Sequence, residues 1–206
     1  MRHTLASLVL ALFLFPSIAK GERSVTIDDL IFRSSNGLYY KKYTDVPFSG
    51  KATGREQGLF KNGMRVGLWV HYHIDGWLES KGTYVNGKKD GPWVEYRKDG
   101  HISLEVNFKQ DKEDTSVEYN YSENGQLEFK TNYKEGKLHG PLTFYYPDGQ
   151  LKCMGSLTTE TKIKDIKYII CIPVSLDLQQ GDWVYYHKNG QLSSKGTYKD
   201  GKKISN

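Results

Sequence analysis

One phrase recurs along this chain, and it constrains the fold more than any other feature of the sequence. In each copy a tyrosine stands four residues before a glycine, and the pairs are Tyr72–Gly76, Tyr96–Gly100, Tyr121–Gly125, Tyr145–Gly149 and Tyr186–Gly190. Successive tyrosines are 24, 25, 24 and 41 residues apart, so the last interval holds extra sequence. A register kept over five copies indicates a repeat architecture in which each copy is one structural unit.

Each unit contains two turn signals, because Asn-Gly and Asp-Gly pairs tolerate positive φ and suit the tight turns between antiparallel strands. The turn glycines are Gly63, Gly76, Gly87, Gly100, Gly125, Gly149, Gly190 and Gly201. The segments between them are rich in Tyr, Trp, Phe, Val and Thr, which favour strands. No glycine-free segment after residue 24 keeps a helical apolar period for three turns. The sequence therefore predicts an all-β protein, an elongated antiparallel meander of hairpin repeats that forms a single-layer twisted sheet.

Large aromatic rings accompany the turns. The position three residues before each tyrosine is occupied, in chain order, by Trp69, Trp93, Glu118, Leu142 and Trp183. Each large ring buries about 150–250 Å², so a narrow meander can build its core from few of them. A structural role is therefore predicted for Trp69, Tyr72, Trp93, Tyr96, Tyr121, Tyr145, Trp183 and Tyr186.

Two details of the repeat predict how the rings are arranged. Trp93 and Tyr96 are separated by an odd number of residues on one strand, so we expect their side chains to project from opposite faces. Gly82 and Gly196 fall in the middle of predicted strands, where glycine is normally unfavourable. We expect a ring from a neighbouring strand to cover each of these glycines.

The pattern GxWxxYxxxGxLxxKGxYxxGKxxG resembles the bacterial variant of the MORN repeat, as in YwqK-like proteins. The resemblance covers about residues 48–206, and residues 36–54, NGLYYKKYTDVPFSGKATG, resemble the lead-in of such proteins. It implies a scaffold or binding surface. Family members are often labelled antitoxins of toxin–antitoxin systems, and eukaryotic relatives are linked to membranes and acidic lipids.

The first 19 residues have the order of a secretory signal peptide. Arg2 and His3 precede an apolar run from Leu5 to Phe15, and small residues lead to an expected cut after Ala19. An uncleaved anchor or a buried N-terminal helix is the alternative. The signal peptide predicts an exported protein, periplasmic or secreted, with no transmembrane segment after its removal. The expected organisation is a leader at 1–19, a lead-in at 20–47 and a repeat domain at 48–206.

The charge balance is mildly basic, with 29 Lys and Arg against 24 Asp and Glu. Nucleic-acid binders concentrate more positive charge on one face, so no nucleic-acid partner is expected. Basic residues follow the same turn in several units and predict a basic rim of Arg65, Lys88, Lys89, Lys137, Lys202 and Lys203. The opposite rim would carry Asp75, Asp99, Glu123 and Asp148. The charges of the basic rim either keep the turns hydrated and protected, or they dock to an anionic lipid, a cell-wall polymer or an acidic protein.

The last repeat interval contains an insertion at about residues 158–180. Its apolar centre suits either an extra hairpin that packs on the sheet or a binding insert. Cys153 and Cys171 could form one disulfide in an exported chain, or stay as free thiols. The spacing alone does not decide between these states.

No grouping of residues predicts catalysis. The sequence lacks a G-x-S-x-G elbow, an H-E-x-x-H pair and a phosphate-binding glycine loop. His71 and His73 would share a strand face, but two ligands are too few for a structural zinc site. The expected protein is thus an exported, non-catalytic module without metal or cofactor, which binds a protein or a cell-envelope component. The alternatives are an antitoxin-like neutraliser of a partner toxin and a binder of anionic lipid or cell-wall polymer.

Overall fold

The computed structural model describes residues 24–157, 171 and 179–205. The predicted leader and most of the predicted insertion lie outside these residues. The elements are β1 (Ser24–Thr26), a short 3₁₀ turn η1 (Ile27–Asp29), β2 (Leu30–Arg33), β3 (Leu38–Lys41), β4 (Gly50–Thr53), β5 (Glu56–Lys61), β6 (Met64–Tyr72), β7 (Leu78–Val85), β8 (Lys88–Tyr96), β9 (Ile102–Lys109), β10 (Lys112–Tyr121), β11 (Leu127–Lys134), β12 (Lys137–Leu138), β13 (Leu142–Tyr145), β14 (Leu151–Leu157), β15 (Gln179–Tyr186), β16 (Leu192–Lys199) and β17 (Lys202–Ser205).

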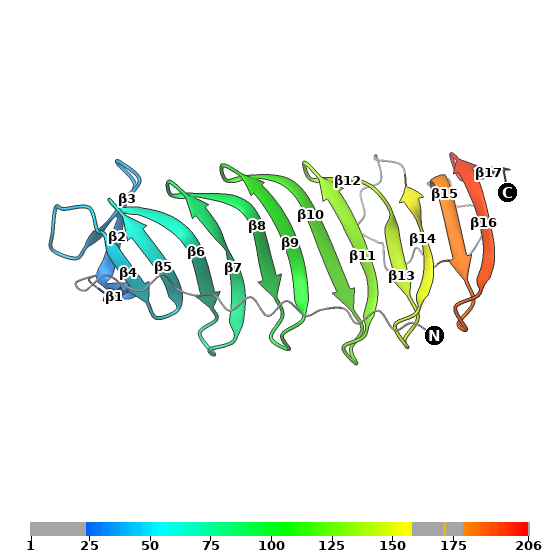
Figure 1. The fold of residues 1–206 in the computed structure, drawn as a ribbon, viewed down its shortest axis with the longest axis horizontal. Coiled ribbons are helices and arrows are strands. Elements are labelled where there is room, and N and C mark those ends of the chain that lie inside the picture. The colour runs from blue at the N-terminus through cyan, green and yellow to red at the C-terminus, as the bar shows by residue number, and fades with distance from the viewer. Residues whose placement is uncertain (1–23, 158–170, 172–178, 206) are drawn as a thin grey trace, which may run out of the picture.

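Fifteen of these strands form one long sheet (Figure 1). From β4 to β17 each strand on the main path pairs antiparallel with the next along the chain, and β12 pairs with β11. β1 joins the sheet edge in parallel with β4, while β2 and β3 form a separate hairpin. The predicted all-β meander in a single layer is confirmed.

Turns of two kinds alternate along the sheet and define its two long edges (Figure 1). The tight-turn edge has two-residue turns in which both residues have positive φ, and these are Asn62–Gly63, Asn86–Gly87, Gln110–Asp111, Glu135–Gly136 and Asp200–Gly201. That is the type I′ geometry, whose twist matches paired strands.

The long-turn edge repeats one backbone pattern five times. The glycine N–H donates to the carbonyl three residues earlier, as from Gly76 to His73 and from Gly100 to Arg97. All eight predicted turn glycines have φ between 76° and 87°. Because this region of backbone space suits glycine, the turns explain why glycine recurs at these positions.

One face of the sheet carries the core, and we call it the tryptophan face. Trp69, Trp93 and Trp183 are at most 2% exposed. A Cβ added to Gly58, Gly82 or Gly155 would collide with the ring of Trp69, Trp93 or Trp183, respectively. Each indole thus lies on bare backbone of the preceding strand, as predicted for Gly82.

The same prediction is wrong for Gly196. The side chain over this glycine belongs to Lys203, and the Ser205 carbonyl lies beside it. The next strand, β17, brings lysine to the position where other units bring tryptophan, so no ring covers Gly196.

The third unit departs from the repeat by its register. Glu118 stands in the tryptophan position when counted from Tyr121, but the residue that pairs with Val106 is Ser116. The irregularity between Glu113 and Thr115 shifts the pairing. Val106 is 5% and Ser116 6% exposed, so a larger residue on β9 is matched by a smaller one on β10.

The buried residues form two clusters, one toward each end of the tryptophan face. The N-terminal cluster contains Phe48, Phe60, Trp69, Tyr84 and Trp93, with Leu30 and Tyr39 of the β2–β3 hairpin packed against it. The C-terminal cluster contains Phe129, Leu142, Phe144, Cys153, Trp183 and Tyr185, with Cys171 packed against it. Segments outside the regular repeats therefore help to cover both clusters.

Tyr96 lies on the opposite face, which we call the tyrosine face. Val94 follows Trp93 in the strand and therefore points to the opposite face. Lys81 pairs with Val94, so Lys81 also lies on this opposite face. The Lys81 Nζ is 5.5 Å from the centre of the Tyr96 ring. Trp93 and Tyr96 therefore project in opposite directions, as expected.

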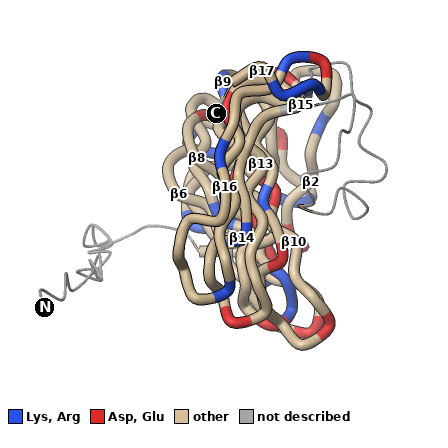
Figure 2. The backbone as a smooth tube through the Cα atoms, turned by 90° about the vertical axis from the view of Figure 1, so that its right-hand side faces the viewer, with Lys and Arg blue, Asp and Glu red and all other residues tan. Residues whose placement is uncertain are grey.

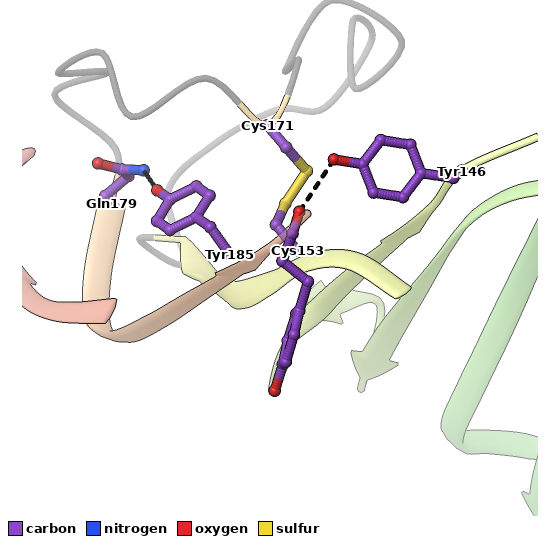
Figure 3. The surroundings of a disulfide bond; sticks show 6 residues. Tyr146, Cys153, Cys171, Gln179 and Tyr185 are labelled. Atoms are coloured by element: carbon purple, nitrogen blue, oxygen red, sulfur yellow. Dashed lines mark hydrogen bonds between the residues drawn. A yellow bond between two sulfur atoms is a disulfide. The ribbon is translucent and has the colours of Figure 1, made fainter. Parts of the chain in front are cut away.

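Cys153 and Cys171 are joined in a disulfide, with their Cα atoms 6.0 Å apart (Figure 3). Cys153 is fully buried, and the side chains around the bridge also hydrogen-bond. Gln179 Nε2 donates to the Tyr185 hydroxyl at 2.8 Å, and the Tyr146 hydroxyl donates to the Tyr186 carbonyl at 2.9 Å. The bridge ties residue 171 to the C-terminal cluster.

Replacing Cys153 and Cys171 together with alanine is expected to lower the free energy of unfolding by about 3 kcal/mol, because a bridge of this span limits the unfolded chain. Urea unfolding with and without reductant measures the effect. The reductant should shift the wild-type midpoint and leave that of the variant in place. Equal midpoints for the two proteins without reductant would contradict the prediction.

Candidate binding surface

Two cations lie over aromatic rings on the tryptophan face. The Arg65 guanidinium is 5.1, 4.6 and 5.3 Å from the ring centres of Tyr39, Trp69 and Tyr84. The Lys89 Nζ is 4.2 Å from the ring centre of Trp93 and 5.0 Å from that of Phe108. Cation–π contacts contribute about 0.5–2 kcal/mol each. We call Arg65, Lys89, His71 and these rings the cationic strip.

Strand pairing brings the two cations to this face. Arg65 and Lys89 follow tight turns and pair with Phe60 and Tyr84, which both belong to the N-terminal core cluster. Paired residues share a face, so both basic side chains turn inward over the rings. The predicted basic rim is therefore wrong for Arg65, whose side chain is only 14% exposed, and for Lys89.

The other members of the predicted basic rim, Lys88, Lys137, Lys202 and Lys203, are exposed residues that follow tight turns. The four predicted acidic residues are also exposed, and they lie at the long-turn edge. Figure 2 shows acidic residues gathered at the bottom of the view, where these turns lie. Several are paired, such as Asp75 with Lys98 at 3.7 Å and Asp99 with Arg97 at 3.4 Å. Exposed pairs of this kind contribute little stability.

Glu56 and His71 complete the polar part of the cationic strip. Arg65 donates to the Glu56 carboxylate at 2.5 Å and to the Tyr84 hydroxyl at 3.0 Å. The same carboxylate is 3.8 Å from His71 Nδ1. The His71 ring centre is 5.7 Å from that of Trp93 and 6.3 Å from that of Trp69, so the imidazole lies beside both indoles.

Burial lowers the pKa of His71 below the ordinary value of 6.5. Glu56 and Glu79 oppose this shift, while the positive charges of Arg65 and Lys89 add to it. The net direction shows that the folded protein favours the neutral imidazole.

The free energy of unfolding is expected to fall as the pH drops below about 6.5, because the unfolded chain takes up the His71 proton first. This contribution is present at neutral pH and is lost as the pH falls toward the lowered pKa of the folded state. Urea unfolding between pH 5 and 8 measures it, at roughly the range in which histidine titrates. His71→Gln should reduce the dependence and His73→Gln, in an exposed turn, should retain it. The same pH dependence in the His71 variant as in the wild type would contradict the assignment.

The two histidines weighed as metal ligands do not converge. His73 lies in the first long turn, where its ring stacks on Trp77 with centres 4.9 Å apart. His71 lies on the tryptophan face beside Glu56. Within the described part of the chain, no group of three or more His, Cys, Asp and Glu residues is placed to hold a metal ion.

The tyrosine face carries a different set of contacts. Tyr72, Tyr96, Tyr121, Tyr145 and Tyr186 are all partly exposed. The Arg97 guanidinium is 5.3 Å from the Tyr121 ring centre. Burial, with a hydrogen bond to Glu105, raises the pKa of Tyr119 to about 12. Tyr119 therefore keeps its proton at neutral pH. The five repeat tyrosines are half-buried packing residues.

The family model of the MORN repeat variant matches residues 65–86, 115–135, 138–156 and 179–200. The match supports the MORN resemblance found in the repeated phrase, whereas a bacterial origin and a YwqK-like relationship stay predictions. The first matched segment contains Arg65, Trp69, His71 and Tyr84 of the cationic strip, whereas Lys89, Trp93, Phe108 and Tyr39 lie outside the matched segments. None of the curated proteins matches the chain.

The structure shows a cluster of cations over aromatic rings that sequence reasoning missed. The sequence indicated basic residues after the tight turns, but not that two of them lie over rings. An available signal was their spacing from tryptophan, since both Arg65 and Lys89 stand four residues before one.

Among the described residues, no helix is long and apolar enough to cross a membrane.

Proposed function

We propose that this protein is an exported, non-catalytic binding module whose MORN repeats hold the cationic strip for a protein or cell-envelope partner. The observation that carries the proposal is the set of buried nitrogen atoms in the strip that have no hydrogen-bond partner. Arg65 Nε, Trp69 Nε1 and His71 Nε2 are in this state. Buried polar atoms in native proteins are nearly all satisfied, so a cluster of exceptions suits a ligand-binding surface.

The repeat architecture supports the same function. Successive hairpins form one continuous sheet, in which each strand is held by its sequence neighbours. Such scaffolds provide extended surfaces for binding. Arg65, His71 and Glu56 of the strip form a cluster of ion pairs. Among the described residues, no hydroxyl or thiol that could act as a nucleophile is hydrogen-bonded to His71.

Export is supported by two features. The leader-like order of the first 19 residues belongs to secreted chains. The disulfide between Cys153 and Cys171 suits an oxidising compartment. The proposed location is therefore the periplasm or the exterior of the cell.

Affinity capture tests the proposed function. Residues 20–206 are immobilised under non-reducing conditions and exposed separately to cytoplasmic and envelope fractions of the native cells. We expect an envelope protein or polymer to be retained and to be absent from a column carrying an unrelated β-protein of similar charge.

Two other outcomes would overturn parts of the proposal. Retention of a cytoplasmic toxin, with rescue of growth when both are co-expressed, would replace export with the antitoxin-like role. Retention of anionic vesicles alone, lost at high salt, would replace the partner with a lipid surface.

A further inference from the structure

We infer that the cationic strip binds a carboxylate carried by an acidic polypeptide segment, with Lys89 as its charged anchor. This inference rests on the proposed binding function and specifies the chemistry of the ligand. The anchor lies on the tryptophan face over Trp93 and Phe108.

The charges of the strip are unbalanced. Arg65 is paired with Glu56, and His71 lies beside the same carboxylate. Lys89, by contrast, forms no ion pair with any carboxylate of the described residues and faces rings instead. A half-buried ammonium group on apolar rings attracts a carboxylate more strongly than a fully hydrated one does, because the local dielectric is lower. The strip therefore has room for one further negative charge.

The repeats provide an internal comparison for the buried nitrogen atoms. Trp93 Nε1 donates to the Thr83 carbonyl at 3.1 Å, and Trp183 Nε1 donates to the Ser156 carbonyl at 3.0 Å. Trp69 has the same place in its unit, but its Nε1 has no partner. Arg65 Nε and His71 Nε2, also without partners, lie in the same unit. Three of the six buried polar atoms without a partner among the described residues lie in this strip, and the others belong to Trp77, Thr131 and Gln179. An unsatisfied buried group costs about 1–3 kcal/mol.

The surroundings favour a polypeptide over a free anion. Phe108 of the strip and its neighbour Leu104 are partly buried, and Phe32, whose ring centre is 5.0 Å from that of Tyr39, is 52% exposed. These groups offer apolar contacts on both sides of the cations. Arg65 and Lys89 lie on β6 and β8, two strand spacings or about 10 Å apart, which an extended peptide of about three residues spans. An acidic side chain with apolar neighbours fits this arrangement.

The probe for the test is a fluorescently labelled random copolymer of glutamate and tyrosine, measured by anisotropy against the full mature chain. We expect binding that weakens with added salt. Lys89→Met should weaken it at least tenfold, whereas Lys89→Arg should stay within about threefold of the wild type because it keeps the charge. Circular dichroism and thermal melting check that both variants are folded.

The neighbouring lysine provides a matched control. Lys88 is exposed and precedes Lys89 directly, so Lys88→Met removes the same charge outside the strip. Its affinity for the copolymer should equal that of the wild type. Equal weakening by the two methionine variants would overturn the inference and favour the basic rim, and wild-type affinity in Lys89→Met would also overturn it.

Two further arms separate the ligand chemistries. Monomeric glutamate should not compete at concentrations where the copolymer does, and vesicles of phosphatidylglycerol should not be bound through Lys89. Competition by glutamate at equal carboxylate concentration, or Lys89-dependent vesicle binding, would overturn the polypeptide assignment.

The inference and the proposed function fail differently. A captured partner that Lys89→Met retains as well as the wild type does would leave the binding function in place and remove this site. Copolymer binding through Lys89 without any captured partner would support the site and remove the proposed function.

Discussion

Replacing Trp93 with alanine is expected to lower the free energy of unfolding by about 3–5 kcal/mol, the range for large buried rings. Trp93 is 2% exposed and lies on the backbone of Gly82. Its ring contacts the edges of Tyr84 and Phe108, with centres 5.1 and 6.3 Å away. Alanine would leave this space empty between three strands. Urea denaturation followed by tyrosine fluorescence and circular dichroism measures the loss.

Trp77 is the control for this substitution. It lies in a long turn and stacks on His73 at the edge of the sheet, outside both core clusters. Trp77→Ala should therefore cost clearly less than Trp93→Ala. If Trp93→Ala left stability unchanged but abolished partner binding, the structural role of Trp93 would be wrong.

Replacing Gly82 with valine is expected to lower the free energy of unfolding by about 3 kcal/mol, the upper part of the usual range for overpacking. A Cβ at this position would collide with the Trp93 indole, which the strands on both sides hold in place. The ring must move or the strands must separate, and either change disrupts the N-terminal cluster. Chemical denaturation of the single variant measures the cost.

The double variant Gly82→Val with Trp93→Ser tests the physical reason. It reproduces the Val106–Ser116 pair that this chain already uses between β9 and β10. We expect the double variant to lose about 1–3 kcal/mol less unfolding free energy than the two single variants lose together, as for residues in direct contact. Simple additivity would show that the glycine and the ring are independent.

Local chemistry explains why so much of the fold was predictable. A tight turn needs two residues with positive φ, and Asn86–Gly87 provides them without help from distant residues. A meander joins neighbours in the chain, so recognising turns and strands also yields the pairing order. The turn at Gln110–Asp111 was missed, since neither residue is glycine and its strands impose the same geometry.

Register was harder to predict. Counting from Tyr121 assigned Glu118 to the tryptophan position, and Glu118 keeps that position in its pairing with Thr131 of β11. Toward β9, however, the irregularity near Glu113 brings Ser116 opposite Val106. Glu118 and Ser116 are two residues apart and share a face of the sheet, so the turn signals do not show which of them lies opposite Val106. The contacts of the whole sheet decide it.

The repeated turns and rings of the sequence by themselves determined an all-β meander, the two alternating turns and the cover of Gly82 by an indole. These features depend on short-range backbone preferences and on ring size. Only the tertiary structure decided that the side chains of Arg65 and Lys89 lie over rings of the tryptophan face instead of on the basic rim. It also decided that Arg65 Nε, Trp69 Nε1 and His71 Nε2 have no hydrogen-bond partner. The direction of a side chain after a turn depends on strand pairing and on which rings lie beneath it, and those rings come from other strands.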